Sequence, residues 1–418
     1  MVKRIVLSVA ILFLILFISC LILINKQNND NEKKLIFWSI QLKPIYEKQI
    51  KNIISEFEKK HPDYKVVWVD IPIQEAQKRT LASVLSSNPP DLINLNPDFS
   101  HILAQRNALD FFEESEVWQY HPALVDKLRY KGKIYGLPFY ATSPVTIYNK
   151  KIYNKCIGGN FVKTYDELYE ISPKIKNCAN ISSLAASLNE NDTLYKILNK
   201  YDIQSFANAK ERNNTLKIYS MFNDMYKKGF ISKDTLTINH REVVEKYMSN
   251  QALTIVAGSN FIKMIKQNAP DVYKESTISP QLTGQNKKYD VSLMNLVIPK
   301  KSKNKELARE FAFELTNKDN QLELAKLTNV LSANKYTLSD DYFKNCQNDI
   351  EQMSRCESAK QLNNLIKEKV EIKDKKALNE NLNKTLEEIL LDKNSCLKTI
   401  EARMNNLFPR LNHFFVEN

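Results

Sequence analysis

The chain has 418 residues, of which 43% are hydrophobic and 26% are charged, and its formal net charge is +12. This length is too great for one simple core and suits two domains of ordinary size. The basic residues are spread along the chain and do not form one stripe with interleaved aromatics, which disfavours a nucleic-acid-binding protein. Only seven glycines occur, and neither GxGxxG nor the Walker pattern is present, so a glycine-rich phosphate-binding loop is excluded.

The N-terminus joins two basic residues to an apolar run, a pattern that indicates export or anchoring. Lys3 and Arg4 precede an apolar segment over residues 5–24. Within it, Phe-Ile-Ser followed by Cys20 resembles a bacterial lipobox, in which the cysteine is lipidated. About 20 apolar residues are also enough to span a bilayer as an uncleaved anchor. Both alternatives place the chain outside the cytoplasmic membrane from about residue 25 onward, with residues 25–34 as a polar tether.

The segment after the tether alternates between extended and helical patterns. Strands are predicted over residues 35–40, 64–71 and 91–95, with helices between them and over residues 99–105. This order predicts a doubly wound α/β sheet. Ligands of such sheets bind beyond the carboxyl ends of the strands, so the ends of these three strands are candidate site positions.

The stretch from Tyr130 to Lys151 predicts either a crossing between two domains or a hairpin within one domain. Gly132 suits the positive φ of a tight turn. Pro138 and Pro144 interrupt a continuous hydrogen-bond ladder but keep the chain extended. Both alternatives fit this local pattern.

The rest of the chain is expected to be largely helical. Thr164 and Glu167 form a capping box that begins a new helical unit. Residues 181–230 and 342–411 are predicted to be mostly helical, and residues 304–314 begin a long helix. Strands are predicted over residues 253–257 and 291–298.

The cysteines and histidines do not form a recognisable metal or catalytic motif. With Cys20 set apart, Cys156 could pair with Cys178, and Cys346 with Cys356, in an oxidising compartment, which would leave Cys396 free. Five unpaired thiols are an equal alternative. The chain contains no CxxC, zinc spacing, GxSxG or HExxH, so we expect a protein that is not an enzyme and has no cofactor and no metal.

A series of short fragments resembles the extracellular solute-binding proteins of ABC importers, and within them the carbohydrate-type family 1 that includes maltose-binding protein. The resemblance covers about residues 35–335. The fragments, in chain order, are FWS, FEKKHPDYKV, NPPDLINL, YKGKIYGLPFY, IYNKKIY, KTYDELYE, NQALTIVAGS and IPKKSKNKELAREFAFEL.

The resemblance implies a two-lobed periplasmic-binding-protein fold of the α/β class, type II-like, with hinge strands and a helix-rich C-terminal region. The first lobe would comprise residues 35–141 and 297–338, and the second lobe residues 146–290 and 339–418. The hinge would lie near residues 141–146, 290–297 and 338–340. Ligand would be held between the lobes, which close over it by a hinge movement.

The resemblance also implies a ligand site made by both lobes. Asn260 departs from the family pattern, because sugar-binding members frequently have a tryptophan there to stack against the ring. Core packing is the alternative role for the aromatic members of the set, and helix capping is the alternative for Asp98. The implied ligand-binding residues are Trp38, Ser39, Gln41, Asn94, Asn96, Asp98, Tyr140, Thr142, Gly258, Ser259 and Asn260.

These observations predict the binding component of an ABC import system. It would capture a small polar solute, with a carbohydrate as the expected class, and deliver it to a membrane permease. We expect a monomer that is tethered to the cytoplasmic membrane on its outer side. A membrane-anchored receptor that signals through a partner is the alternative function.

Overall fold

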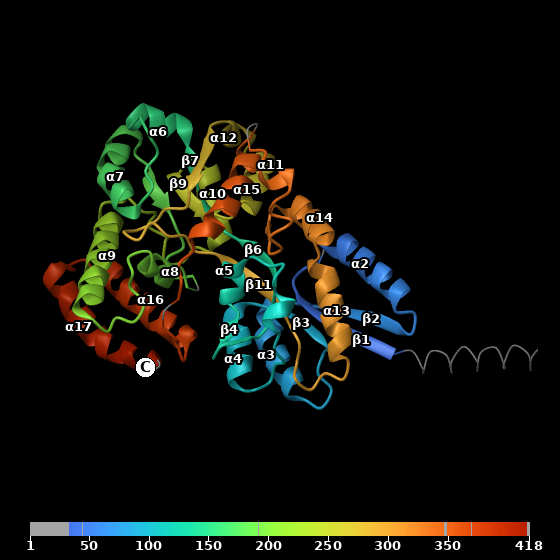
Figure 1. The fold of residues 1–418 in the computed structure, drawn as a ribbon. Helices are drawn as coiled ribbons and strands as arrows, with labels where there is room; N and C mark the ends of the chain where they lie inside the picture. The colour runs from blue at the N-terminus through green and yellow to red at the C-terminus, as the bar shows by residue number, and fades with distance from the viewer. Residues whose placement is uncertain (1–32, 44, 191, 347–348, 369, 416–418) are drawn as a thin grey trace, which may run out of the picture.

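The computed structural model describes residues 33–43, 45–190, 192–346, 349–368 and 370–415. These residues form two α/β lobes, each built on its own sheet (Figure 1). Cys20, the predicted segment 1–24 and nearly all of the predicted tether lie outside the described residues. Among the residues that are described, no helix is both long and apolar enough to cross a membrane.

The first lobe is built on a six-stranded sheet with the strand order β12-β6-β11-β3-β1-β2. β1 pairs in parallel with β2 and β3, whereas β11 pairs antiparallel with β3 and β6. The carboxyl ends of β1, β2, β3 and β6 therefore share one edge of the sheet, where β11 begins. The strands are β1 (Lys33–Ile40), β2 (Tyr64–Ile71), β3 (Leu92–Leu95), β6 (Leu137–Thr142), β11 (Ser292–Val297) and β12 (Leu331–Ser332).

Alternation along the strands gives this sheet two apolar faces, each covered by helices. Phe37 points to the face covered by α2 (Glu47–Lys60), α13 (Lys305–Thr316) and α14 (Lys318–Thr328). Ile93 points to the opposite face, which is covered by α3 (Ile73–Leu85) and α4 (Pro97–Gln105). Both faces are buried, as a doubly wound sheet requires, and the predicted fold class is confirmed.

The second lobe is built on a four-stranded sheet with the order β10-β7-β9-β8. Its strands are β7 (Val145–Asn149), β8 (Ser182–Ala185), β9 (Ala252–Ala257) and β10 (Ser276–Pro280). One face packs against α10 (His240–Met248), α11 (Asn260–Asn268) and α15 (Ile350–Gln361). The other face packs against α6 (Lys150–Cys156) and α7 (Tyr165–Ala179). The same core continues into α9 (Ala209–Lys227), against which α16 (Lys375–Leu391) and α17 (Leu397–Leu411) pack.

Several short elements complete the fold. They are α5 (Pro122–Asp126), β4 (Arg129–Tyr130), β5 (Lys133–Ile134), α8 (Thr193–Asn199) and α12 (Pro270–Lys274). β4 and β5 form the predicted hairpin, with Lys131 and Gly132 both at positive φ. The stretch from Tyr130 to Lys151 thus contains a hairpin in the first lobe and then crosses to the second through only two residues, Ser143 and Pro144, between β6 and β7.

The local predictions were mostly correct, with two exceptions. The capping box of Thr164 and Glu167 is present at the start of α7. The expectation that residues 181–230 are mostly helical was wrong at its beginning, where β8 pairs in parallel with β9. Asp98 is not the cap of α4, because Asn96 accepts the hydrogen bond from the Phe99 amide. The predicted lobe boundaries remain a prediction, since residues 343–365 contribute to the cores of both lobes.

The described residues contain two disulfide bonds. Cys156 is joined to Cys178, which ties α6 to α7, and Cys346 is joined to Cys356. Cys396 is free and exposed. The cysteine spacing left two alternatives, two disulfides or five unpaired thiols, and the structure has the two disulfides.

The packing between α13 and the first sheet predicts a large effect of Phe311→Ala. The Phe311 ring is fully buried between Phe37 and Phe57, with centroid distances of 5.6 Å and 4.9 Å. Loss of a buried ring leaves a cavity, and we expect the free energy of unfolding to fall by about 3–5 kcal/mol. Urea denaturation measures this change. Phe313→Ala is the matched control on the same helix, because Phe313 is only partly buried; equal losses for both variants would contradict the packing described.

Candidate functional site

The candidate site lies where the two sheets meet. The carboxyl ends of β1, β3 and β6 reach the junction from the first lobe. From the second lobe, β9 ends there at Ala257, which pairs with Val145 at the start of β7. All the predicted site residues lie at or next to these ends, and their side chains differ in how far they are available to a ligand.

Ser39, at the end of β1, is used inside the first lobe. Its hydroxyl is fully buried, donates to Asp70 Oδ1 at 2.5 Å and accepts from Trp68 Nε1 at 2.7 Å. Asp70 also accepts from the backbone amides of residues 42 and 43. This network holds the loop after β1, in which Gln41 is exposed and has a φ of 50°.

Trp38 lies on the opposite face of β1 from Ser39 and is partly buried. The Arg79 guanidinium lies 5.7 Å from the centroid of its ring. A cation over an indole face is a favourable contact, so part of this ring is already covered by the protein. Trp38 therefore packs in part within its own lobe, and its contact with a ligand stays a prediction.

The end of β3 carries three polar residues with different surroundings. Asn94 is fully buried, donates to the Asn295 carbonyl at 3.3 Å and leaves its own Oδ1 without a partner. Asn96 caps α4 through its side chain. Asp98 follows in the first turn of α4 and has a side chain that is half exposed. Since Asn96 makes the cap, the Asp98 carboxylate is free of that role.

Tyr140 and Thr142 lie on β6 as it approaches the second lobe. The Tyr140 ring stacks on Tyr46 at a centroid distance of 6.0 Å, and burial raises the pKa of its hydroxyl above the ordinary range. Thr142 faces Gly258 so closely that a Cβ added to Gly258 would lie 2.8 Å from its Cγ2. β6 and the loop after β9 therefore approach each other closely at the junction, and a role of these residues in ligand binding stays a prediction.

The other two residues of the second-lobe loop differ in exposure. Ser259 is buried and its hydroxyl lies 3.3 Å from the Asn329 carbonyl, to which it donates. Asn260 is exposed at the start of α11. Of the predicted polar set, the side chains of Gln41, Asn96, Asp98 and Asn260 are thus the exposed ones.

A cluster of charged residues around Asp98 was not predicted from the sequence. Lys375, at the start of α16 in the second lobe, places its Nζ 3.0 Å from Asp98 Oδ1 and 3.9 Å from Glu368 Oε1. Lys127 of the first lobe lies 3.8 Å from the same Glu368 oxygen. The nearby ammonium groups, with Lys375 foremost, lower the pKa of Glu368 to about 2. Asp98 and Lys127 are more than 200 residues from Glu368 and Lys375 in the sequence, and no local pattern marks the cluster.

Lys196 of α8 extends this cluster toward the crossing between the lobes. Its Nζ lies 3.1 Å from Asp192 Oδ1 and 3.4 Å from Ser292 Oγ at the start of β11. His101, on α4 close to Asp98, has a buried Nε2 with no partner, and burial lowers the pKa of its ring. Lysine and carboxylate side chains from both lobes therefore converge at the junction.

Buried polar residues hold the crossing segments together. The side chain of Gln361, on α15, donates to Ser143 Oγ at 2.9 Å and to the Pro144 carbonyl at 2.8 Å. It also accepts from the backbone N–H of Gln281 at 2.7 Å. Lys200 is only 2% exposed in its side chain and lies 2.9 Å from Asp290 Oδ2. Burial lowers the pKa of Lys200, whereas the ammonium groups of Lys200 and Lys196 outweigh burial and lower the pKa of Asp290.

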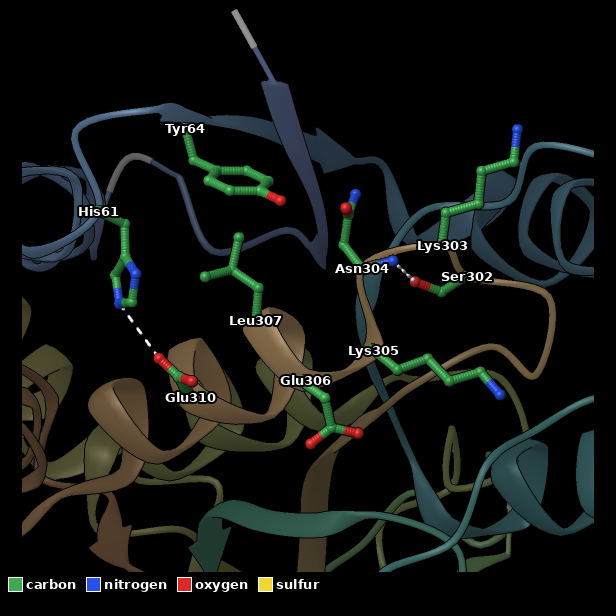
Figure 2. A pocket seen from close by; sticks show the side chains of 9 residues that line it. All are labelled: His61, Tyr64, Ser302, Lys303, Asn304, Lys305, Glu306, Leu307 and Glu310. Atoms are coloured by element: carbon green, nitrogen blue, oxygen red, sulfur yellow. Dashed lines mark hydrogen bonds and ion pairs between the residues drawn. The ribbon is translucent and has the colours of Figure 1, made fainter.

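A hollow of about 440 Å³ lies on the outer side of the first lobe, away from the junction (Figure 2). His61 and Tyr64 face α13 across it, and His61 Nε2 lies 3.2 Å from Glu310 Oε2. Tyr64 begins β2, so this hollow is at the amino end of the parallel strands. Ligands of open α/β sheets bind at the carboxyl ends, which favours the junction as the functional site.

The described residues contain no group of three or more His, Cys, Asp or Glu side chains placed to hold a metal ion. The side chains at the junction offer hydrogen bonding by amides, hydroxyls and carboxylates, together with charge pairing. Such groups orient a polar ligand by hydrogen bonds.

Comparisons with known proteins find similar sequences and folds over most of the chain. The family model of bacterial extracellular solute-binding proteins matches residues 52–347, which is more than half of the chain. A galactooligosaccharide-binding protein of Bacillus subtilis (strain 168) is 22% identical over 331 residues, 75% of this chain and 76% of that protein. A maltotriose-binding protein of Pyrococcus abyssi is 25% identical over 145 residues, and the match spans only 34% of this chain and 30% of that protein.

Solved structures share the fold. The sugar-binding protein MalE from Xanthomonas citri superposes with a TM-score of 0.75 at 18% identity, covering 91% of this chain and 97% of that one. A cyclo/maltodextrin-binding protein complexed with maltotetraose has a TM-score of 0.70 at 18% identity, covering 90% and 96% of the two chains. At these identities the likeness establishes the two-lobed fold.

The contact between Thr142 and Gly258 predicts that Gly258→Ala destabilises the junction. The new methyl group would overlap Thr142 Cγ2 and the Asn260 side chain, and overpacking of this kind costs about 1–3 kcal/mol. Urea denaturation measures the loss. Adding Thr142→Ser removes Cγ2 and should restore part of the stability. Failure of the double variant to recover any stability would contradict the close approach as the cause.

Proposed function

Because the chain belongs to the family of bacterial extracellular solute-binding proteins, we propose that it holds an oligosaccharide between its two lobes and delivers it to an ABC permease. The family places the protein outside the cytoplasm, as the binding component of an importer. The ligand class is our inference from the names of its relatives and from the chemistry at the junction. Tethering through Cys20 or through residues 5–24 belongs to the same proposal.

The observation that carries the proposal is the position of Asp98. Its carboxylate stands at the carboxyl end of β3, half exposed, and faces the second lobe at the junction. An ionised carboxylate accepts strong hydrogen bonds, which suits the hydroxyl groups of a sugar. The exposed amides of Gln41, Asn96 and Asn260 supply further donors and acceptors on both sides.

The relatives support an oligosaccharide as the ligand. Two proteins of Bacillus subtilis that match about three quarters of this chain are named for binding galactooligosaccharides and arabinooligosaccharides. Asn260 offers hydrogen bonds where a stacking ring is common in sugar-binding members, so we expect recognition here to depend more on polar contacts than on stacking.

Binding without covalent chemistry is the function that fits this site. The relatives are named as binding proteins, not as enzymes. A receptor coupled to a signalling partner, the alternative from the sequence, would use the same site, but the family match and the relatives favour import.

Ligand binding should stabilise the folded protein against heat. A ligand at about 100 times its Kd adds about 2.7 kcal/mol to the free energy of unfolding. A thermal-shift screen of neutral oligosaccharides, with monosaccharides and polyamines as comparison sets, measures this effect. A rise in Tm with polyamines alone would contradict the proposed ligand class.

Asp98→Ala should weaken the binding of an oligosaccharide identified in that screen. Loss of a hydrogen bond to a charged acceptor costs about 1.5–3 kcal/mol, so we expect Kd to rise by about 10- to 100-fold in isothermal titration calorimetry. Asp126→Ala is the control, because Asp126 lies in the same lobe but pairs with Arg129. An unchanged Kd for Asp98→Ala would remove this residue from the site.

A further inference from the structure

We propose that Lys375 latches the two lobes together by binding Asp98 across the junction. Asp98 lies on α4, whose residues Phe99 and Leu103 pack in the core of the first lobe. Lys375 begins α16, whose residues Leu378 and Leu382 pack in the core of the second lobe. The contact of 3.0 Å between Lys375 Nζ and Asp98 Oδ1 therefore joins two separately packed bodies.

The latch is part of a chain of alternating charges. Lys375 also lies 3.9 Å from Glu368, and Glu368 lies 3.8 Å from Lys127, which follows α5 in the first lobe. Positive and negative groups thus alternate from Asp98 through Lys375 and Glu368 to Lys127. The first and last of these charged residues, Asp98 and Lys127, belong to the first lobe, whereas Lys375 belongs to the second.

The surroundings of Lys375 favour its charged form. Burial by itself lowers the pKa of the ammonium, but Asp98 and Glu368 outweigh burial and raise it above the ordinary value. The Lys375 side chain is 18% exposed, so its pairing is less screened by salt than that of a fully exposed lysine.

The latch is compatible with ligand binding to the same carboxylate. Lys375 contacts Asp98 Oδ1, and a carboxylate has about four acceptor positions on its two oxygens. A ligand hydroxyl can donate to Oδ2 while Lys375 remains in place. The latch therefore acts on the balance between closed and open lobes before any ligand arrives, and it assumes only the hinge movement of the proposed function.

Single-molecule energy transfer in the absence of ligand tests this latch. Dyes are attached to non-natural residues at the exposed positions 78 on α3 and 174 on α7, one in each lobe, so that the disulfides stay intact. We expect Lys375→Met to lower the closed-to-open ratio by about two- to five-fold, the range of a partly exposed ion pair. Raising NaCl from about 0.05 M to about 0.5 M should lower the ratio in the unaltered protein and lower it less in Lys375→Met, which keeps only the Lys127–Glu368 pair of the chain of alternating charges.

Lys376→Met is the matched control. Lys376 is the next residue on α16, its side chain is 82% exposed, and it lies 3.8 Å from Glu380 on its own helix. Its replacement should leave the ratio unaltered. Asp98→Asn should have the same effect as Lys375→Met, and the double variant should add nothing further, because the two residues act as one pair.

Two results would overturn the latch. One is a Lys375→Met distribution identical to that of the unaltered protein, and the other is an equal shift for Lys375→Met and Lys376→Met. Circular dichroism of each variant verifies the fold. Because every measurement is made without ligand, failure of the latch is distinguishable from failure of the proposed oligosaccharide binding.

Discussion

The placement of the two lobes depends on buried polar groups at the segments that cross between them. Lys200 is buried beside Asp290, and Gln361 bonds to both Ser143 and the Gln281 backbone. Leaving one of these groups without its partner would bury an unpaired charge or amide, which is strongly unfavourable. The network therefore fixes where β7 begins relative to the end of β6, and with it the edge at which the two sheets face each other.

The polar residues at this edge divide into those that shape the lobes and those that remain available between them. The Ser39 hydroxyl bonds to Asp70 and Trp68, and the Asp70 carboxylate also accepts from the backbone of the loop after β1. Asp98 is different, because Asn96 caps α4 and leaves the Asp98 carboxylate to groups beyond its own lobe. In the structure the Asp98 carboxylate binds Lys375 of the second lobe. The same carboxylate thus belongs both to the proposed ligand site and to the proposed latch between the lobes.

In the proposed latch, the C-terminal helices have a role beyond packing. α16 and α17 close the apolar core of the second lobe beside α9, and Figure 1 shows them at the side of the lobe, away from its sheet. The first residue of α16 nevertheless reaches the first lobe. A helix whose body is held by apolar contacts can present the charge at its beginning in a defined position, because its backbone is rigid.

The sequence alone determined the features that arise from neighbouring residues. Short extended apolar segments predicted β1, β2 and β3, and the spacing of Thr164 and Glu167 predicted the start of α7. The order of fragments predicted the two-lobed fold. It failed for β8, a four-residue strand whose extended form depends on pairing with β9. Short strands carry little local signal, because their hydrogen bonds come from distant parts of the chain.

For the site, the sequence placed Asp98, Thr142 and Gly258 at strand ends that do meet at the junction. It could not show that Ser39 and Asn94 are buried, that Asn96 is the cap of α4, or that Lys375 lies beside Asp98. Those features depend on which side chains the packed lobes bring within hydrogen-bonding distance. A separation of 277 residues between Asp98 and Lys375 leaves no periodic pattern in the sequence, so only the tertiary structure decides that contact.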